Sequence, residues 1–263
     1  MPILTTIGSG LFYTVQGEGT ALLFVHPPLL TSANFTNQVA ELSQKFKVIT
    51  FDIRGHGRSP YSLQPITYQL IAEDMKQLLD HLGIEKAFLC GYSAGGSIVL
   101  EFLLTHANRA LGGIIVSGMS EVRDSNNVKR ISMARMLTKI GAVPLLGLSV
   151  SWSNSNTLQI FKNIYRESLK GNSRNIEQYY QYSLEYNCTN QLKTIDKPIL
   201  LIFGEKDKNF HPYAVLLHKK LPNNELKFLH GKHQIPTKAA VELNQLIQKF
   251  ILSKLINGGN AQC

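Results

Sequence analysis

Residues 90–96 read CGYSAGG and place Ser93 between two glycines, Gly91 and Gly95. The run before them is typical of a buried strand, and the residues after them have helical periodicity. A serine at such a tight strand-to-helix turn is held in a strained backbone conformation that lifts its hydroxyl clear of the sheet edge. The glycines leave room for strand and helix to pass closely, and the helix N-terminus favours developing negative charge. The spacing therefore predicts an exposed nucleophile at Ser93.

A serine hydroxyl needs a base within hydrogen-bond reach, and the base needs an acid that orients it. His233 lies in a loop between the last predicted strand and the last predicted helix, and Asp207 follows a core strand after a short glycine-containing turn. Functional groups of open α/β sheets collect at these carboxyl ends of strands. The chain order Ser93, Asp207, His233 is also the order expected for this kind of turn. We therefore predict a catalytic triad of these three residues.

Other histidines and carboxylates are weaker candidates because of their positions. His230 ends a predicted strand, which suits a structural role, and His211 lies just before a helix. Asp196 precedes its strand and so belongs to the opposite edge of the sheet. Asp124 stays an alternative acid, as does Glu205, which is expected to point away from the site.

Strand-like and helix-like segments alternate along most of the chain. Apolar, β-branched runs predict strands within 11–26 (two strands around a Gly-rich turn) and at 47–53, 86–90, 110–118, 197–204 and 224–230. Helical spacing predicts helices at 31–46, 67–84, 96–110, 212–221 and 237–255. Such alternation implies right-handed crossover units, so the predicted fold class is α/β with a largely parallel sheet.

One long segment, residues 119–190, breaks this alternation. It has no apolar strand run and is helix-like and polar, with nine Lys or Arg against five Asp or Glu. It lies between two predicted core strands and is far longer than an ordinary connection. We therefore expect a helical cap at 119–190 on an α/β core built from residues 1–118 and 191–263. Additional helical packing on the face of the sheet is the alternative.

The composition of the chain is that of an ordinary globular protein, with 44% hydrophobic and 17% charged residues. The net charge of +9 comes from scattered basic residues without a dense block, so no nucleic-acid partner is expected. Three cysteines, Cys90, Cys188 and Cys263, are widely spaced and form no disulfide framework. The beginning of the sequence has no signal-peptide pattern, and no apolar run is long enough to span a membrane. These features together predict a cytoplasmic protein.

Several ordered motifs make the chain similar to the α/β-hydrolase superfamily over nearly its full length. They are VHPPLLTSANF, FDIRGHGRSP, CGYSAGG, FGEKD and GKH. The resemblance implies a mostly parallel eight-stranded sheet, a triad of Ser93, Asp207 and His233, no cofactor, and a variable cap above the site. It also implies an oxyanion hole that uses the backbone N–H of Ala94.

The second oxyanion donor departs from the superfamily pattern. Many relatives carry His-Gly-X after the first core strand, and X donates its N–H, whereas this chain reads His26-Pro27-Pro28-Leu29. Proline has no N–H to donate. We expect Leu29 to supply the donor through a shifted loop. The alternatives are a hole with one donor fewer and a proline pair that only stiffens the loop.

These features predict a serine hydrolase that cleaves a carboxylic ester or related acyl compound of small size through an acyl-enzyme. Thioester, lactone, carbon–carbon bond and perhydrolase reactions stay open, because the nucleophile motif does not distinguish them. Tyr92 and Met119 flank strand ends near Ser93 and are predicted to line the substrate pocket, together with Trp152 from the expected cap. The alternative from another class is a ligand receptor or signalling protein that keeps a hydrolase pocket.

Overall fold

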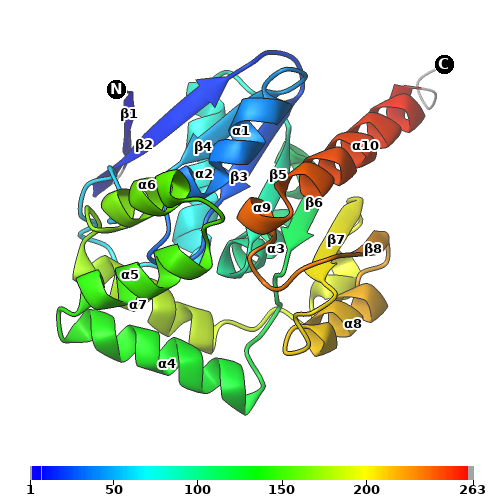
Figure 1. The fold of residues 1–263 in the computed structure, drawn as a ribbon. Coiled ribbons are helices and arrows are strands. Elements are labelled where there is room, and N and C mark those ends of the chain that lie inside the picture. The colour runs from blue at the N-terminus through cyan, green and yellow to red at the C-terminus, as the bar shows by residue number, and fades with distance from the viewer. Residues whose placement is uncertain (1, 7, 260–263) are drawn as a thin grey trace.

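The computed structural model describes residues 2–6 and 8–259, and within them eight strands form one sheet (Figure 1). The strand order across the sheet is β1-β2-β4-β3-β5-β6-β7-β8. The strands are β1 (Ile3–Thr6), β2 (Ser9–Gln16), β3 (Ala21–Val25), β4 (Lys47–Phe51), β5 (Ala87–Tyr92), β6 (Ala110–Val116), β7 (Ile199–Gly204) and β8 (Asn224–Leu229). The predicted α/β class with a mostly parallel eight-stranded sheet is confirmed.

Strands β3 to β8 run parallel, and the first two strands are antiparallel additions at one edge. The register places Val25 opposite Gly91 and Tyr92 opposite Val116, so these parallel strands end together at one edge of the sheet. The loops that leave β3, β5, β6, β7 and β8 therefore meet at that edge, where residues can be brought together for chemistry.

Helices cover both faces of the sheet, as Figure 1 shows. One face carries α2 (Tyr68–His81), α3 (Ala94–Thr105) and α8 (His211–Lys220), and the other carries α1 (Thr36–Leu42), α9 (Ile235–Lys238) and α10 (Ala240–Gly259). Short 3-10 turns lie at Ser32–Phe35, Ala107–Arg109 and Leu192–Thr194. The helices complete the crossovers that parallel strands require.

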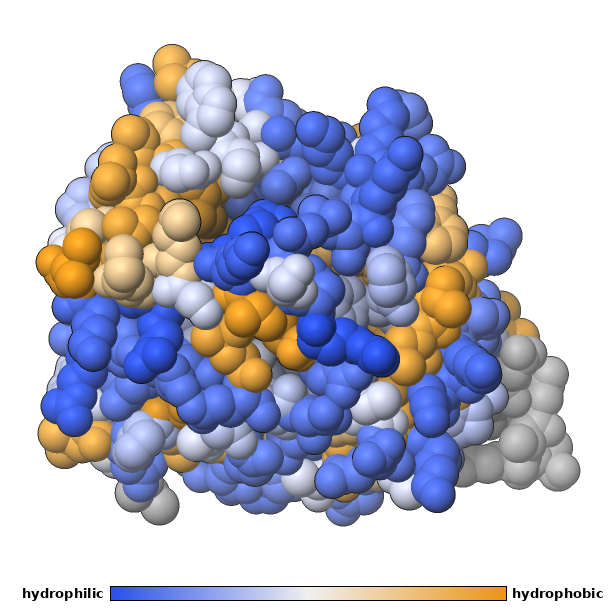
Figure 2. Space-filling view, turned by 90° about the horizontal axis from the view of Figure 1, so that it is seen from below, coloured by the Kyte–Doolittle hydropathy of each residue, from blue (hydrophilic) through white to orange (hydrophobic). Residues whose placement is uncertain are grey.

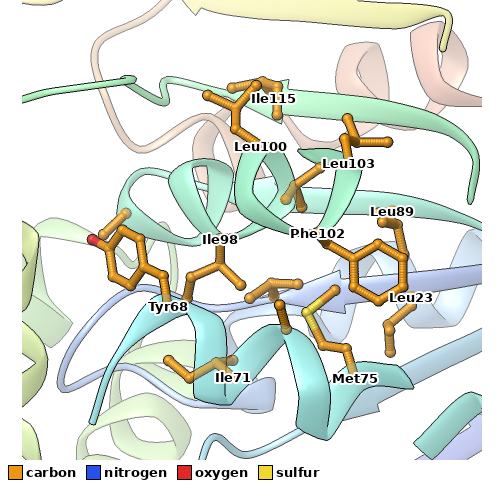
Figure 3. Packing of buried hydrophobic residues seen from close by; sticks show 14 of the residues in the cluster. Leu23, Tyr68, Ile71, Met75, Leu89, Ile98, Leu100, Phe102, Leu103 and Ile115 are labelled. Carbon is orange, nitrogen blue, oxygen red and sulfur yellow. The ribbon is translucent and has the colours of Figure 1, made fainter. Parts of the chain in front are cut away.

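Alternation along each strand divides the core into two layers. Leu23 of β3, Leu89 of β5 and Ile115 of β6 face α2 and α3, where Figure 3 shows them packing among Met75 and Phe102. The next residue along the same strands faces the other layer, beneath α1 and α10. Burial on both faces explains why these strands appear in the sequence as continuous apolar runs.

Four helices connect β6 to β7 and occupy the region expected to be an insertion. They are α4 (Ser125–Lys139), α5 (Val143–Ser153), α6 (Leu158–Ser168) and α7 (Ser173–Glu185), here called the α4–α7 segment. Figure 1 shows α4, α5 and α7 below the end of the sheet in that view, with α6 to the left of it. Val143, Leu146, Ile176 and Tyr180 of this segment form a small apolar cluster with Leu29 from the loop after β3.

Buried polar groups hold the loops after β3 and β4 in place. The Asp52 carboxylate accepts hydrogen bonds from the backbone N–H groups of Ser32 (2.8 Å) and Arg58 (2.9 Å). His26 Nε2 accepts the N–H of Ile53 at 2.9 Å, and the Tyr179 hydroxyl of α7 donates to the His26 carbonyl at 3.0 Å. The two loops and α7 are therefore joined by direct hydrogen bonds.

Arg54 lies in the same region and is fully buried. Its Nε donates to Asp74 of α2 at 2.7 Å, and a second guanidinium nitrogen also bonds to that carboxylate. A buried ion pair with two hydrogen bonds fixes the position of its loop, because removing either partner would leave an uncompensated charge.

Cys90 and Cys188 are buried free thiols, and Cys263 lies outside the described residues. Burial raises the pKa of both buried thiols, so they stay protonated at neutral pH. Of the helices in the described ranges, none combines the length and the apolar character needed to cross a membrane.

Candidate active site

Ser93 stands between the last residue of β5 and the first residue of α3. Its backbone has φ 54° and ψ −122°, a region that residues with a side chain seldom occupy. Its N–H donates to the carbonyl of Val116 at 2.8 Å, which fixes the turn to the neighbouring strand β6. The sharp turn predicted from the sequence is present, and the surrounding bonds hold the strained residue in place.

The two glycines that flank Ser93 are required by close backbone contacts. A Cβ atom on Gly91 would lie 2.2 Å from the carbonyl oxygen of Gly95. A Cβ atom on Gly95 would lie 2.2 Å from the carbonyl oxygen of Val25 in β3. Both contacts involve backbone atoms, so rotating a side chain cannot relieve them.

The structure brings Ser93, His233 and Asp207 together from three separate loops. Ser93 Oγ lies 3.0 Å from His233 Nε2, and His233 Nδ1 lies 2.8 Å from Asp207 Oδ2. Asp207 follows β7 and is 8% exposed, and His233 lies between β8 and α9. The Asp207 carboxylate accepts a hydrogen bond from Nδ1–H of the imidazole, which leaves Nε2 as the acceptor that faces the serine hydroxyl.

The alternative histidines and acids are engaged elsewhere. His230 is exposed and pairs with Glu205 at 3.3 Å, away from the serine. His211 contacts the carbonyl of Gly204 at 3.0 Å, and Asp124 accepts from the Asn127 N–H (2.8 Å) at the start of α4. Asp196 lies before β7, at the opposite end of that strand from Asp207. None of these groups contacts Ser93 within the described chain.

The backbone N–H groups of Ala94 and Leu29, near the expected oxyanion hole, have no hydrogen-bond partner among the described residues. Ala94 begins α3, so its N–H points out of the helix start. Leu29 has φ 69°, and its buried side chain packs against the α4–α7 segment. Pro27 and Pro28 line the space beside Ser93. The roles of Ala94 and Leu29 stay predictions.

A pocket of about 170 Å³ opens at Ser93 and is here called the inner pocket. Its walls come from the ends of β3, β5, β6 and β8 with the loops that follow them, and from α4, α5 and α7. They include Pro28, Tyr92, Met119, Ile131, Val150, Asn154, Tyr180, Ser183 and Gln234. The Tyr92 hydroxyl donates to Asn154 Oδ1 at 3.0 Å, and burial raises the pKa of that phenol. Tyr92 and Met119 both line this pocket, which is the location expected for them from the sequence.

Trp152 does not line the inner pocket, and this part of the prediction is wrong. Its side chain is 70% exposed and lies against Phe161 over a separate hollow between α5 and α6. The physical reason is the rotation of α5, which turns Val150, Ser153 and Asn154 toward the pocket and position 152 away from it.

Several residues at the site carry no signal in the sequence. Arg130, Asn154 and Tyr180 come from the α4–α7 segment, whose helices have no strand pattern to orient them. Phe210 packs its ring against the His233 imidazole with 4.2 Å between ring centroids. For Phe210 the sequence does offer a signal for a place at the site, because this residue follows Asp207 by three positions on the same strand-end loop.

Two buried histidines lie behind the site. His26 and His56 have ring centroids 5.4 Å apart, and burial lowers the pKa of His26 to about 4 and that of His56 to about 3. Both rings are therefore neutral at physiological pH. In the part of the chain that the structure describes, no three His, Cys, Asp or Glu side chains are grouped to hold a metal ion.

This fold, with a serine at a strained turn hydrogen-bonded to a histidine and an aspartate, defines a class of protein. Residues 20–236 match the family described as the alpha/beta hydrolase fold, and the chain belongs to that family. Hydrolysis is the general activity that this membership supports.

Individual relatives agree on the family and differ in their named reactions. The chain is 25% identical over 278 aligned residues to a non-heme haloperoxidase of Rhodococcus erythropolis, covering 96% of this chain and 100% of the relative. It is 29% identical over 200 residues to the carboxylesterase YbfK of Bacillus subtilis, covering 74% and 66%. The solved enol-lactonase of Burkholderia xenovorans LB400 superposes with a TM-score of 0.86 at 19% identity, covering 95% of this chain and 100% of that one, which supports the fold.

Proposed function

We propose that the protein is a serine hydrolase that cleaves a carboxylic ester or related acyl substrate through an acyl-enzyme. The observation that carries the proposal is the continuous hydrogen-bonded series from Ser93 Oγ to His233 (3.0 Å) and from His233 to Asp207 (2.8 Å). Family membership and a carboxylesterase relative support hydrolysis. The pocket that opens at Ser93 gives a small acyl substrate access to the hydroxyl.

In the first half-reaction, Ser93 Oγ forms a bond to the substrate carbonyl carbon while His233 Nε2 takes the hydroxyl proton. The carbonyl oxygen becomes an oxyanion, and Asp207 stabilises the imidazolium. As the oxyanion collapses, the bond to the leaving oxygen breaks and His233 gives that oxygen its proton. Water then attacks the acyl-enzyme by the same steps, which releases the acid and restores Ser93.

The oxyanion in this proposal is held by the backbone N–H groups of Ala94 and Leu29. Neither group is used in the described structure, and α3 begins at Ala94 with its dipole favouring negative charge. Leu29 follows directly on Pro28, which lines the inner pocket. One such donor contributes about 3 kcal/mol to transition-state stabilisation.

The α4–α7 segment acts in this proposal as the cap that selects the substrate. It supplies Arg130, Val150, Asn154 and Tyr180 to the wall of the inner pocket, whereas the triad residues come from the sheet core. Substrate choice and chemistry are then separable, because the two sets of side chains belong to different parts of the chain.

The proposal is tested with p-nitrophenyl esters of rising acyl length and with a fluorophosphonate that labels activated serines. Ser93→Ala removes the attacking oxygen, so we expect loss of turnover and of labelling with the fold retained. Ser253→Ala is the matched control because Ser253 lies on α10 and donates only to the Phe250 carbonyl. It should react like the wild type.

A Ser93→Ala variant with full activity would overturn the proposal. A wild-type protein that reacts once and slowly, and is then stabilised by the retained ligand, would indicate a receptor instead. Repeated turnover that depends on Ser93 supports the enzyme.

A further inference from the structure

A second hollow, of about 390 Å³, opens at Ser93 beside the inner pocket, and is here called the outer groove. Its wall is mostly apolar and comes from α4 and α5, with Met133, Ala134, Leu137, Leu145 and Leu146. The inner pocket instead carries Ser153, Asn154, Ser183 and Gln234. Figure 2 shows hydrophobic side chains gathered on the face that carries the α4–α7 segment, with hydrophilic residues between them.

Arg130 of α4 is a wall residue of both hollows. Both hollows also contain Ser93 and His233, so Arg130, an exposed residue, lines the region where the two spaces meet at the nucleophile. Among the described residues that line them, Arg130 is the sole Lys, Arg, Asp or Glu. Its charge acts on the phenol of Tyr92, next to Ser93 in the chain, and opposes the burial that raises the pKa of that phenol.

The Arg130 guanidinium has no ion pair or hydrogen bond to any residue in the described ranges. Arg135, farther along the same helix, instead bonds to Glu177 of α7 at 2.6 Å. Arg135 thus has its carboxylate within the fold, whereas the five N–H donors of Arg130 are left for solvent or a ligand, beside hollows whose described walls carry no Asp or Glu.

A second unused donor lies beside it. Tyr180 of α7 is 9% exposed and lines both hollows, and its hydroxyl has no hydrogen-bond partner among the described residues. Burial raises the pKa of this phenol, so it carries its proton at neutral pH and can donate. A guanidinium and a phenol that both offer hydrogens are complementary to an acceptor with several lone pairs and a negative charge.

We propose that Arg130, assisted by Tyr180, binds a carboxylate on the substrate, so that the preferred acyl compounds are anionic. The inference rests on the proposed hydrolase function and specifies its substrate class: an ester with a free carboxylate a few atoms from the scissile carbonyl. The apolar remainder of the substrate lies in the outer groove. Arg130 acts as a specificity-determining residue and takes no part in proton transfer.

The test compares two esters of equal acyl length, mono-4-nitrophenyl adipate with a free carboxylate and 4-nitrophenyl hexanoate without one. Arg130→Gln should lower kcat/KM for the adipate ester about 10- to 100-fold, mainly through KM, because a charged hydrogen-bonded contact has that strength. The hexanoate value should change less than about 2-fold, since a neutral acyl chain forms no such contact. Arg130→Lys should retain part of the preference, and Tyr180→Phe should lose a smaller part.

Lys129→Gln is the matched control, since Lys129 is the neighbouring cation on α4 and lines neither hollow. It should leave both esters unaffected. An equal fall for both esters with Arg130→Gln would overturn the proposal, because it would place Arg130 in the chemistry or the fold. An absent wild-type preference for the adipate ester would also overturn it.

Failure of this inference is distinguishable from failure of the proposed hydrolase function. Ser93-dependent hydrolysis of the hexanoate ester without any preference for the anion would leave the hydrolase standing and remove the role of Arg130. Calorimetric titration of Ser93→Ala with monomethyl adipate provides a readout that needs no turnover. Binding should weaken when Arg130→Gln is added, and an unchanged affinity would contradict the carboxylate site.

Discussion

Two carboxylates separated by one residue, Glu205 and Asp207, show how local surroundings determine a role. The Glu205 side chain is 53% exposed and contacts His230, which is also on the surface. The Asp207 side chain is 9% exposed and contacts His233, whose ring is covered by Phe210 and Tyr92. The buried pair keeps one imidazole tautomer and one ring orientation, whereas the exposed pair is weakened by solvent.

Asp207→Asn should therefore lower kcat about 10⁴-fold for every ester, because an amide at this position favours the wrong imidazole tautomer while leaving the geometry intact. Steady-state kinetics on 4-nitrophenyl hexanoate measures the effect. Glu205→Gln is the matched control and should keep wild-type activity. Equal losses in the two variants would contradict the assignment of Asp207.

The sequence was informative about residues at strand ends and uninformative about residues in the α4–α7 segment. Ser93, Asp207 and His233 follow parallel strands, and parallel strands deliver their C-terminal residues to one edge. Arg130 and Tyr180 lie on helices without a sheet to fix their rotation, so tertiary packing decides which side faces the pocket. Trp152 was misjudged for the same reason, since aromatic character alone does not indicate the direction of a side chain.

At the scale of elements, the close approach of α3 to β3 is what holds the nucleophile turn. Gly95→Ala would place a Cβ atom 2.2 Å from the Val25 carbonyl oxygen, so either the helix or the strand has to move. We expect a loss of several kcal/mol in the free energy of unfolding, at least about 3, together with lost activity. Urea denaturation followed by circular dichroism measures it.

Gly141→Ala is the control for this change. Gly141 has φ 78° with open space around its Cβ position, so alanine there incurs only the backbone strain of about 1 kcal/mol. If both alanine variants were destabilised equally, crowding at position 95 would be contradicted, because Gly95 lies in α3 without a positive φ and alanine there has no backbone strain of its own.

Most elements were foreseeable from periodicity, and the exceptions have physical causes. Continuous apolar runs indicated β3 to β7 because these strands are buried on both faces. The strand Ile3–Thr6 escaped notice because it is four residues long, largely exposed and paired only with β2. Chain order also did not give the order across the sheet, since β4 lies between β2 and β3.

At the scale of the whole molecule, the neutral pair His26 and His56 makes stability depend on pH. Their pKa values in the folded protein are about 4 and about 3, against an ordinary 6.5 for each ring. In the unfolded chain both rings accept protons as the pH falls below 6.5, and in the folded protein they do not. The stabilisation is therefore complete above pH 6.5 and is lost progressively on acidification.

Each of these histidines should lower the free energy of unfolding by about 1.4 kcal/mol per pH unit below 6.5. Urea titrations between pH 7.5 and 5 measure the slope. His56→Asn should reduce this slope, because asparagine has no group that titrates in this pH range. Its amide also keeps a hydrogen-bond donor near the Arg54 carbonyl, which His56 Nδ1 contacts. A variant at position 56 that keeps the wild-type slope would refute the explanation.

The hydrogen bond from the Tyr179 hydroxyl to the His26 carbonyl has a consequence for how a substrate enters. His26 leads directly into the Pro27–Pro28 turn beside the nucleophile, so lifting α7 away would break the contact that holds this turn. Within the described ranges, helices α4 and α5, which form much of the wall of the outer groove, donate no hydrogen bond to this turn. We therefore expect α7 to keep its place when a substrate enters, because its displacement would loosen the backbone beside Ser93.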